Sequence, residues 1–146
     1  QTAKFTFRNQ HDDAKFSNKL QNTTNKLSKN SVKFKDTTMK KGKKTYTVQL
    51  TGLNKCIAKD KTFNTLYVDT NIKGKDKKKV TVTNVKVFFD GKKVKTIKKG
   101  VLTPDPGQTD GFVQLQIINM WNSRVAKFKY TMPKKTIKVT YTVKIK

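Results

Sequence analysis

Apolar and polar residues alternate with a period of two along most of this chain, and this alternation constrains the fold more than any other feature. The last segment, 136–146, reads TIKVTYTVKIK, with an apolar residue at every second position and Thr or Lys between them. Successive side chains of a strand point to opposite faces of a sheet, so this segment is predicted to be a half-buried strand with a Thr/Lys solvent face. The same pattern predicts strands at 2–8, 44–51, 62–70, 79–89, 112–119 and 124–131, and shorter ones at 32–34 and 94–97.

Turn-forming residues separate these segments. The pair Asp90-Gly91 predicts a hairpin turn, 73–76 predicts a second turn, and 103–107 predicts a loop because its two prolines cannot donate to a strand ladder. The apolar phase slips by one at Asn84, which predicts a bulge or a crossing between sheets. Many short strands at this spacing are typical of all-β proteins, and we predict an antiparallel β-sandwich of jelly-roll type.

The segment 12–29 departs from the alternation. Its apolar residues Phe16, Leu20 and Leu27 have a spacing that a helix allows, with Asp12 or Asp13 as the cap. The segment therefore predicts one short helix near the N-terminus or, alternatively, two short turns. The 146 residues suit one domain and contain no long linker or repeat, so residues 1–146 are expected to form a single domain.

Lysine dominates the charge of the chain. Lys and Arg number 34 against 9 acids, giving a formal net charge of +25, and only Arg8 and Arg124 are arginines. The lysines crowd together at 39–44, 73–79, 92–99 and 133–138. Such a field attracts polyanions, but two arginines are few for reading bases, so we expect no sequence-specific nucleic-acid binding. The alternative is that the lysines serve solubility alone.

The apolar content supports a core but not a membrane span. Leu, Ile, Val and Phe together number 36 of 146 residues, or 25%, which exceeds the roughly 20% below which a highly charged chain is disordered. No apolar stretch approaches the ~20 residues that cross a bilayer, so no membrane insertion is expected.

Few residues suit catalysis. His11 and Cys56 are the only residues of their types, which are too few for a zinc site with four such ligands. The chain has no phosphate-binding loop and no nucleophile motif. Asp105 and Asp110 share a loop, but most of the nine aspartates lie in predicted turns. We therefore predict no catalytic residue and no enzyme activity.

Several side chains with oxygen atoms lie in or near predicted loops and could bind a calcium ion, which takes 6–8 oxygen ligands. These residues are Asp69, Asn71, Asp105 and Asp110. Turn formation explains the same residues. We expect no cofactor and no metal site, with a structural calcium ion as the alternative.

Five segments carry a resemblance to a known family. They are 46–53 (YTVQLTGL), 63–72 (FNTLYVDTNI), 82–92 (VTNVKVFFDGK), 100–105 (GVLTPD) and 117–122 (IINMWN). In this order they resemble the carbohydrate-binding-module-like β-sandwich domains of secreted proteins from Gram-positive gut and rumen bacteria. The resemblance implies a non-catalytic, secreted or cell-surface module, monomeric within a larger multimodular protein, and it also implies a structural calcium. The chain begins at Gln1 without an initiator Met, which we interpret as a processed protein or an excised piece.

We predict that the protein binds a polysaccharide of plants or cell walls, either neutral or acidic. The predicted site pairs the aromatic residues Trp121 and Tyr67, which would stack on sugar, with side chains that would hydrogen-bond hydroxyls or attract acidic groups. The hydrogen-bonding residues are Asn71, Asn119 and Asn122, and the flanking cations are Lys73, Lys75, Lys92 and Lys93. One alternative is an electrostatic adhesin or wall-associated module that binds polyanions through its lysine clusters. Another is a structural spacer or protein-interaction module.

Overall fold

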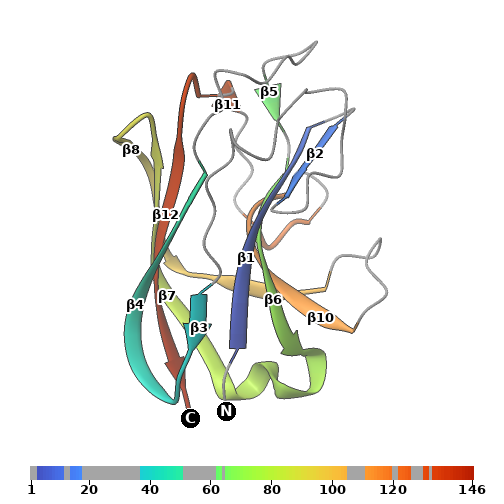
Figure 1. The fold of residues 1–146 in the computed structure, drawn as a ribbon. Coiled ribbons are helices and arrows are strands. Elements are labelled where there is room, and N and C mark those ends of the chain that lie inside the picture. The colour runs from blue at the N-terminus through green and yellow to red at the C-terminus, as the bar shows by residue number, and fades with distance from the viewer. Residues whose placement is uncertain are drawn as a thin grey trace.

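The computed structural model describes residues 3–11, 14–17, 37–50, 62–63, 65–104, 111–119, 122–125, 130–131 and 133–146. Most of these residues are in β-strands, and every strand pairing among them is antiparallel (Figure 1). The alternation in the sequence therefore predicts the class of this fold correctly.

The strands form two main sheets. The six-stranded sheet contains, in spatial order, β2 (Ala14–Ser17), β1 (Ala3–His11), β6 (Thr65–Lys73), β10 (Phe112–Asn119) and β9 (Val101–Thr103), with β3 (Thr37–Met39) also paired to β1. The four-stranded sheet has the order β4 (Gly42–Leu50), β12 (Ile137–Ile145), β7 (Val80–Phe89) and β8 (Lys92–Lys99). A short pair joins β5 (Thr62–Phe63) to β11 (Tyr130–Thr131).

One apolar cluster draws side chains from both main sheets. Its members alternate along β4, β7 and β12 and along β6 and β10. The largest fully buried side chains are Tyr141, Leu66, Leu115, Ile117, Ile118 and Ile137. Burial of apolar surface is the main favourable contribution to folding, so this shared cluster holds the two sheets together.

Strand β10 is buried more completely than alternation predicts. All of its residues from Val113 to Asn119 are buried, and they include Gln114 at 0% and Gln116 at 2% exposure. Polar side chains on the second face of this strand are therefore as inaccessible as the apolar ones on the first. Period-two patterning identifies the strand but does not show that both of its faces are covered.

The phase slip at Asn84 is a β-bulge. Thr83 pairs with Thr142 and Lys86 pairs with Thr140, so Asn84 and Val85 together oppose the one residue Tyr141. Asn84 has a φ of 52°, a conformation that Asn tolerates better than most residues. The extra residue returns Val85 to the apolar cluster, and the predicted bulge is confirmed.

The predicted hairpin turn at Asp90-Gly91 is also confirmed. Both residues have positive φ, 51° and 83°, as the two-residue type I′ turn requires. The Asp90 carboxylate accepts backbone N–H hydrogen bonds from Lys134 at 2.8 Å, Lys135 at 2.7 Å and Thr136 at 3.0 Å. The tip of the β7–β8 hairpin is thus fastened to the chain that enters β12.

The chain passes between the two main sheets at two places that matter for the site. Where the sequence predicts a turn, a short 3-10 helix, η2 (Gly74–Lys79), links β6 to β7 at the bottom of Figure 1. The second passage is at Gly100, between β8 and β9, where the Gly100 N–H donates to the Val82 carbonyl at 2.8 Å. A Cβ on Gly100 would lie 2.8 Å from Leu115 Cδ1 and 3.0 Å from Val82 Cγ1, so any larger residue here would require these side chains to move.

Two predicted elements differ from the structure. The helix expected within 12–29 is wrong for residues 14–17, which form β2 against β1, and the remainder of that segment lies outside the described residues. Of the strand expected at 124–131, residues 130–131 form β11, Arg124 and Val125 lie in a turn, and 126–129 are outside the described residues. The short strand expected at 32–34 also lies outside the described residues. No helix in the described segments has the length and apolar character needed to cross a bilayer.

Candidate functional site

Tyr67, one of the two aromatic residues predicted to stack on sugar, is buried. It lies on β6 opposite Gln116 of β10, and its exposed fraction is 3%. A ring so enclosed offers no face to a polysaccharide, so the expectation that Tyr67 points outward is wrong. The physical reason is the coverage of the second face of the six-stranded sheet. The other aromatic residue, Trp121, lies outside the described residues.

Two of the three predicted ligand-binding asparagines, Asn119 and Asn122, instead stabilise a turn with their side chains. Asn119 is 6% exposed, and its Nδ2 donates to Gln116 Oε1 at 2.8 Å. Asn122 Nδ2 donates to the same oxygen at 3.4 Å, and Asn122 Oδ1 accepts from the backbone N–H of Arg124 at 3.0 Å. The side chain of Asn119 faces inward, which contradicts its predicted role on the surface. Asn71 lies on β6, and its side chain is outside the described part.

The four predicted flanking lysines do not form one site. All four are exposed, but Lys73 ends β6 and Lys75 lies in η2, whereas Lys92 and Lys93 begin β8 after the hairpin turn. Strand β7 separates the two pairs by its full length, about 30 Å at ~3.4 Å per residue, and they lie at opposite ends of the molecule (Figure 1).

The structure brings together a different set of cations around a cavity of about 580 Å³, which we call the basic groove. Its lining comes from η2, β7, the end of β8, β9 and the turn after β10. The lining residues are Lys77, Lys78, Val80, Thr81, Val82, Lys99, Gly100, Val101, Leu102 and Arg124. This volume falls within the ~300–1,000 Å³ typical of ligand pockets.

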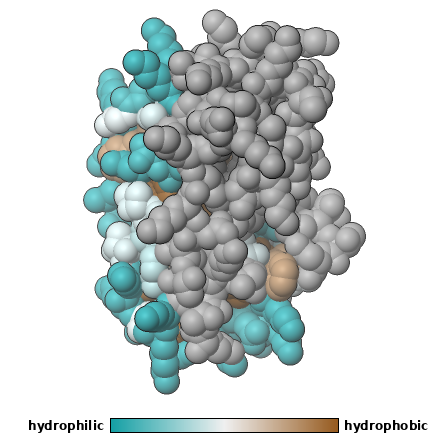
Figure 2. Space-filling view, in the orientation of Figure 1, coloured by the Kyte–Doolittle hydropathy of each residue, from teal (hydrophilic) through white to brown (hydrophobic). Residues whose placement is uncertain are grey.

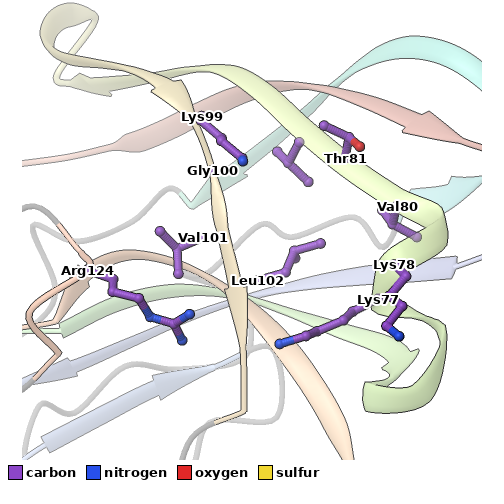
Figure 3. Close-up of a pocket in the computed structure, with 10 residues that line it drawn as sticks. Lys77, Lys78, Val80, Thr81, Lys99, Gly100, Val101, Leu102 and Arg124 are labelled. Atoms are coloured by element: carbon purple, nitrogen blue, oxygen red, sulfur yellow. The ribbon is translucent and has the colours of Figure 1, made fainter.

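Local structure explains how these residues meet. The close passage at Gly100 carries β9 over Val82, so the floor is apolar and includes Val82, Val101 and Leu102. Lys99 precedes Gly100 at the end of β8. In Figure 3, Arg124 and the lysines of η2 lie on opposite sides of β9, with Lys99 near Gly100. The rim is cationic and the floor is apolar.

Arg124 is positioned by the asparagine turn. Its backbone N–H is held by Asn122 Oδ1 at 3.0 Å, and its Nη2 donates to Thr103 Oγ1 at 3.4 Å. A guanidinium has a planar fork of donors that matches a carboxylate or phosphate bidentately, whereas an ammonium acts as a point charge. One of the two arginines of the chain therefore stands at the groove beside three lysines.

Electrostatics favour an anion in the basic groove. Among the described lining residues there are four cations and no aspartate. The salt bridge of η2 joins Asp76 Oδ1 to Lys79 Nζ at 3.8 Å, and Lys79 is not among the described lining residues. Close cations with no aspartate among the described lining residues raise the local positive potential, and the apolar walls focus it.

In the described part of the chain, no group of three or more His, Cys, Asp or Glu side chains is placed to bind a metal ion. The side chain of Asp69 and the residues Asp105 and Asp110 lie outside that part, so the calcium alternative stays a prediction.

The basic groove is not apparent from the sequence because its four cations lie between positions 77 and 124. The cluster 73–79 includes Lys77 and Lys78, and 92–99 includes Lys99, yet only the fold places them beside Arg124. The one signal in the sequence is Arg124 itself, one of only two arginines among 34 cationic residues.

Comparisons with known proteins give no match: no family model, no curated protein and no solved structure is similar to this chain. The resemblance to carbohydrate-binding modules therefore stays a prediction.

Proposed function

We propose that this protein is a non-catalytic, secreted or cell-surface module that binds an acidic polysaccharide in the basic groove. The observation that carries the proposal is the cavity of about 580 Å³ with Lys77, Lys78, Lys99 and Arg124 on its rim. Each cation would pair with a carboxylate or sulfate of the polymer, and the apolar floor would pack against the C–H face of a sugar ring.

The proposed fold is an antiparallel β-sandwich of jelly-roll type. One apolar cluster shared by both main sheets supports two packed layers. Neighbouring strands that are not consecutive in the chain, such as β4 and β12 or β6 and β10, support Greek-key connections. In this fold the groove lies where the chain passes from one layer to the other.

An acidic polysaccharide fits the groove better than the alternatives do. A neutral sugar would need a stacking ring, and the described lining of the groove contains no aromatic residue. Single-stranded nucleic acid would need exposed aromatic rings in a basic channel, whereas the described groove lining contains no aromatic residue. A spacer would need no cationic cavity.

A charge-matched pair of variants tests the groove. The groove variant carries Lys77→Gln, Lys78→Gln and Lys99→Gln, and the control variant carries Lys40→Gln, Lys41→Gln and Lys44→Gln at exposed positions outside the lining. Calorimetric titration with polygalacturonate at ~0.15 M salt should show about a tenfold loss of affinity in the groove variant and less than a twofold loss in the control, since each exposed ion pair is worth a factor of about 1.5 to 5.

Two further measurements, on an arginine variant and at high salt, make the test more specific. Arg124→Lys keeps the charge, so a loss of about fivefold would show that the guanidinium fork is used. Raising the salt to ~1 M should abolish most of the binding because the Debye length falls to about 3 Å. Equal losses in the groove and control variants, or tighter binding of single-stranded DNA than of polygalacturonate, would contradict the proposal.

A further inference from the structure

The outward surface of the four-stranded sheet carries lysine and threonine in regular rows, and we call it the Thr/Lys face. Its residues alternate with the buried ones of the core and are exposed or half-buried. The register places them in four rows across the strands: Lys43, Lys144 and Thr81; Thr45, Thr142, Thr83 and Lys99; Thr47, Thr140, Lys86 and Thr96; and Gln49, Lys138, Phe88 and Lys93.

Side-chain contacts confirm that neighbours in a row share this face. Thr45 Oγ1 and Thr142 Oγ1 are 2.9 Å apart. In the last row, Lys138 Nζ lies 4.4 Å from the centroid of the Phe88 ring, so an ammonium covers the one aromatic side chain of the face. No row contains an aspartate.

The Thr/Lys face is continuous with the basic groove. Thr81 and Lys99 line the groove and also belong to the first two rows. Figure 2 shows mostly hydrophilic and intermediate side chains, in teal and white, with a smaller hydrophobic patch in brown, along the side of the molecule where Figure 1 places this sheet. A polymer that leaves the groove past Lys99 would therefore meet further cations and hydroxyls.

We infer that the groove and the Thr/Lys face form one extended track for an acidic polysaccharide, with the groove as the anchoring subsite. This inference rests on the proposed function and specifies its ligand as a long chain. The polymer enters at Arg124 and η2, passes Lys99, and crosses the sheet toward Lys86, Lys93 and Lys138. Lysine ammonium groups pair with its acidic groups, and threonine hydroxyls donate to its oxygens.

The last row of the Thr/Lys face is too far from the basic groove to affect a ligand that occupies the groove alone. From Lys144 to Lys138 the face extends six residues along β12, about 20 Å. The last row therefore lies more than the ~8 Å Debye length of physiological salt from the groove, so its lysines act only on ligand that reaches them. A short oligomer in the groove should not sense them.

The test compares the binding of a short acidic oligosaccharide with the binding of a long polymer. The face variant carries Lys93→Gln and Lys138→Gln, both in the row farthest from the groove, and its charge-matched control carries Lys40→Gln and Lys41→Gln. Affinities for a galacturonate trimer and for long polygalacturonate would be measured at ~0.15 M salt, with thermal unfolding confirming that each variant is folded. We expect the face variant to lose about tenfold in affinity for the long chain and to bind the trimer like the wild-type protein.

The outcomes separate the inference from the proposed function. If the face variant binds the long chain as its charge-matched control does, the extended track is overturned, while a weakened groove variant would still support the proposed function. If the face variant loses affinity for the trimer as well, the separation of the two surfaces is overturned. If the groove variant binds both ligands like the control, the proposed function itself fails.

Discussion

Leu115→Ala is expected to lower the free energy of unfolding by about 3 kcal/mol, within the range of about 2–5 kcal/mol measured for buried Leu→Ala changes. Leu115 is fully buried in the shared apolar cluster. Its loss would leave a cavity beneath the passage at Gly100, where the surrounding backbone is held by the hydrogen bond from Gly100 to Val82. Equilibrium urea unfolding followed by circular dichroism measures the change.

A double-mutant cycle shows whether the Gly100 passage causes this sensitivity. Gly100→Ala alone should cost about 1–3 kcal/mol, because its Cβ would lie 2.8 Å from Leu115 Cδ1. In the Leu115→Ala background that neighbour is gone, so the same change should cost about 1 kcal/mol less. Val82 still crowds the position, so the cost should not vanish. Additive losses would mean that Leu115 and Gly100 do not compete for space.

Asp90→Ala is expected to destabilise the protein by about 2 kcal/mol. The change removes the acceptor for three backbone N–H groups, each worth roughly 0.5–1.5 kcal/mol at a buried site and less here because Asp90 is exposed. It also places alanine at a φ of 51°, which costs about 1 kcal/mol. The control is Asp76→Ala, which removes only a surface pair with Lys79 and should change stability by less than about 0.5 kcal/mol. Similar losses in both variants would contradict the role of Asp90.

The same carboxylate should make stability depend on pH. Partial desolvation would raise the pKa of Asp90, but the hydrogen bonds from Thr136, Lys134 and Lys135 and the charge of Lys134 together lower it below its ordinary value of 3.8. Folding therefore favours the ionised form, and its contribution is present above the ordinary pKa and lost as the pH falls through the lowered one. The stability difference between wild type and Asp90→Asn should shrink between about pH 5 and about pH 2; a constant difference would contradict this assignment.

The fold class, the bulge and the hairpin turn are all readable from the sequence because each depends on neighbouring residues. Alternation marks strands, a phase slip marks Asn84, and Asp90-Gly91 suits a turn with two positive φ angles. The burial of Tyr67 is not readable in this way. Its environment depends on coverage of a second sheet face, and the residues that decide this are distant in sequence.

The site is less predictable than the fold for the same reason. The lysine clusters point correctly to an excess of positive charge, but they do not show which cations share a cavity. Lys77 and Arg124 line the same cavity only because the fold places η2 and the turn after β10 on opposite sides of β9. Asn119 and Asn122 were predicted as ligand contacts from their place beside Trp121, and their hydrogen bonds instead support Gln116 and Arg124.

The hydrogen bond from Gly100 to Val82 has a further consequence for how binding can be observed. The Gly100 amide lies in the lining of the basic groove, and its proton exchanges with solvent only when the Gly100 junction separates locally from β7. A ligand that binds the closed form reduces the population of the open form in proportion to its saturation. Deuterium uptake at this one amide should therefore slow by about a hundredfold at a ligand concentration of 100 times Kd. Unchanged uptake would mean that the ligand sits elsewhere on the protein.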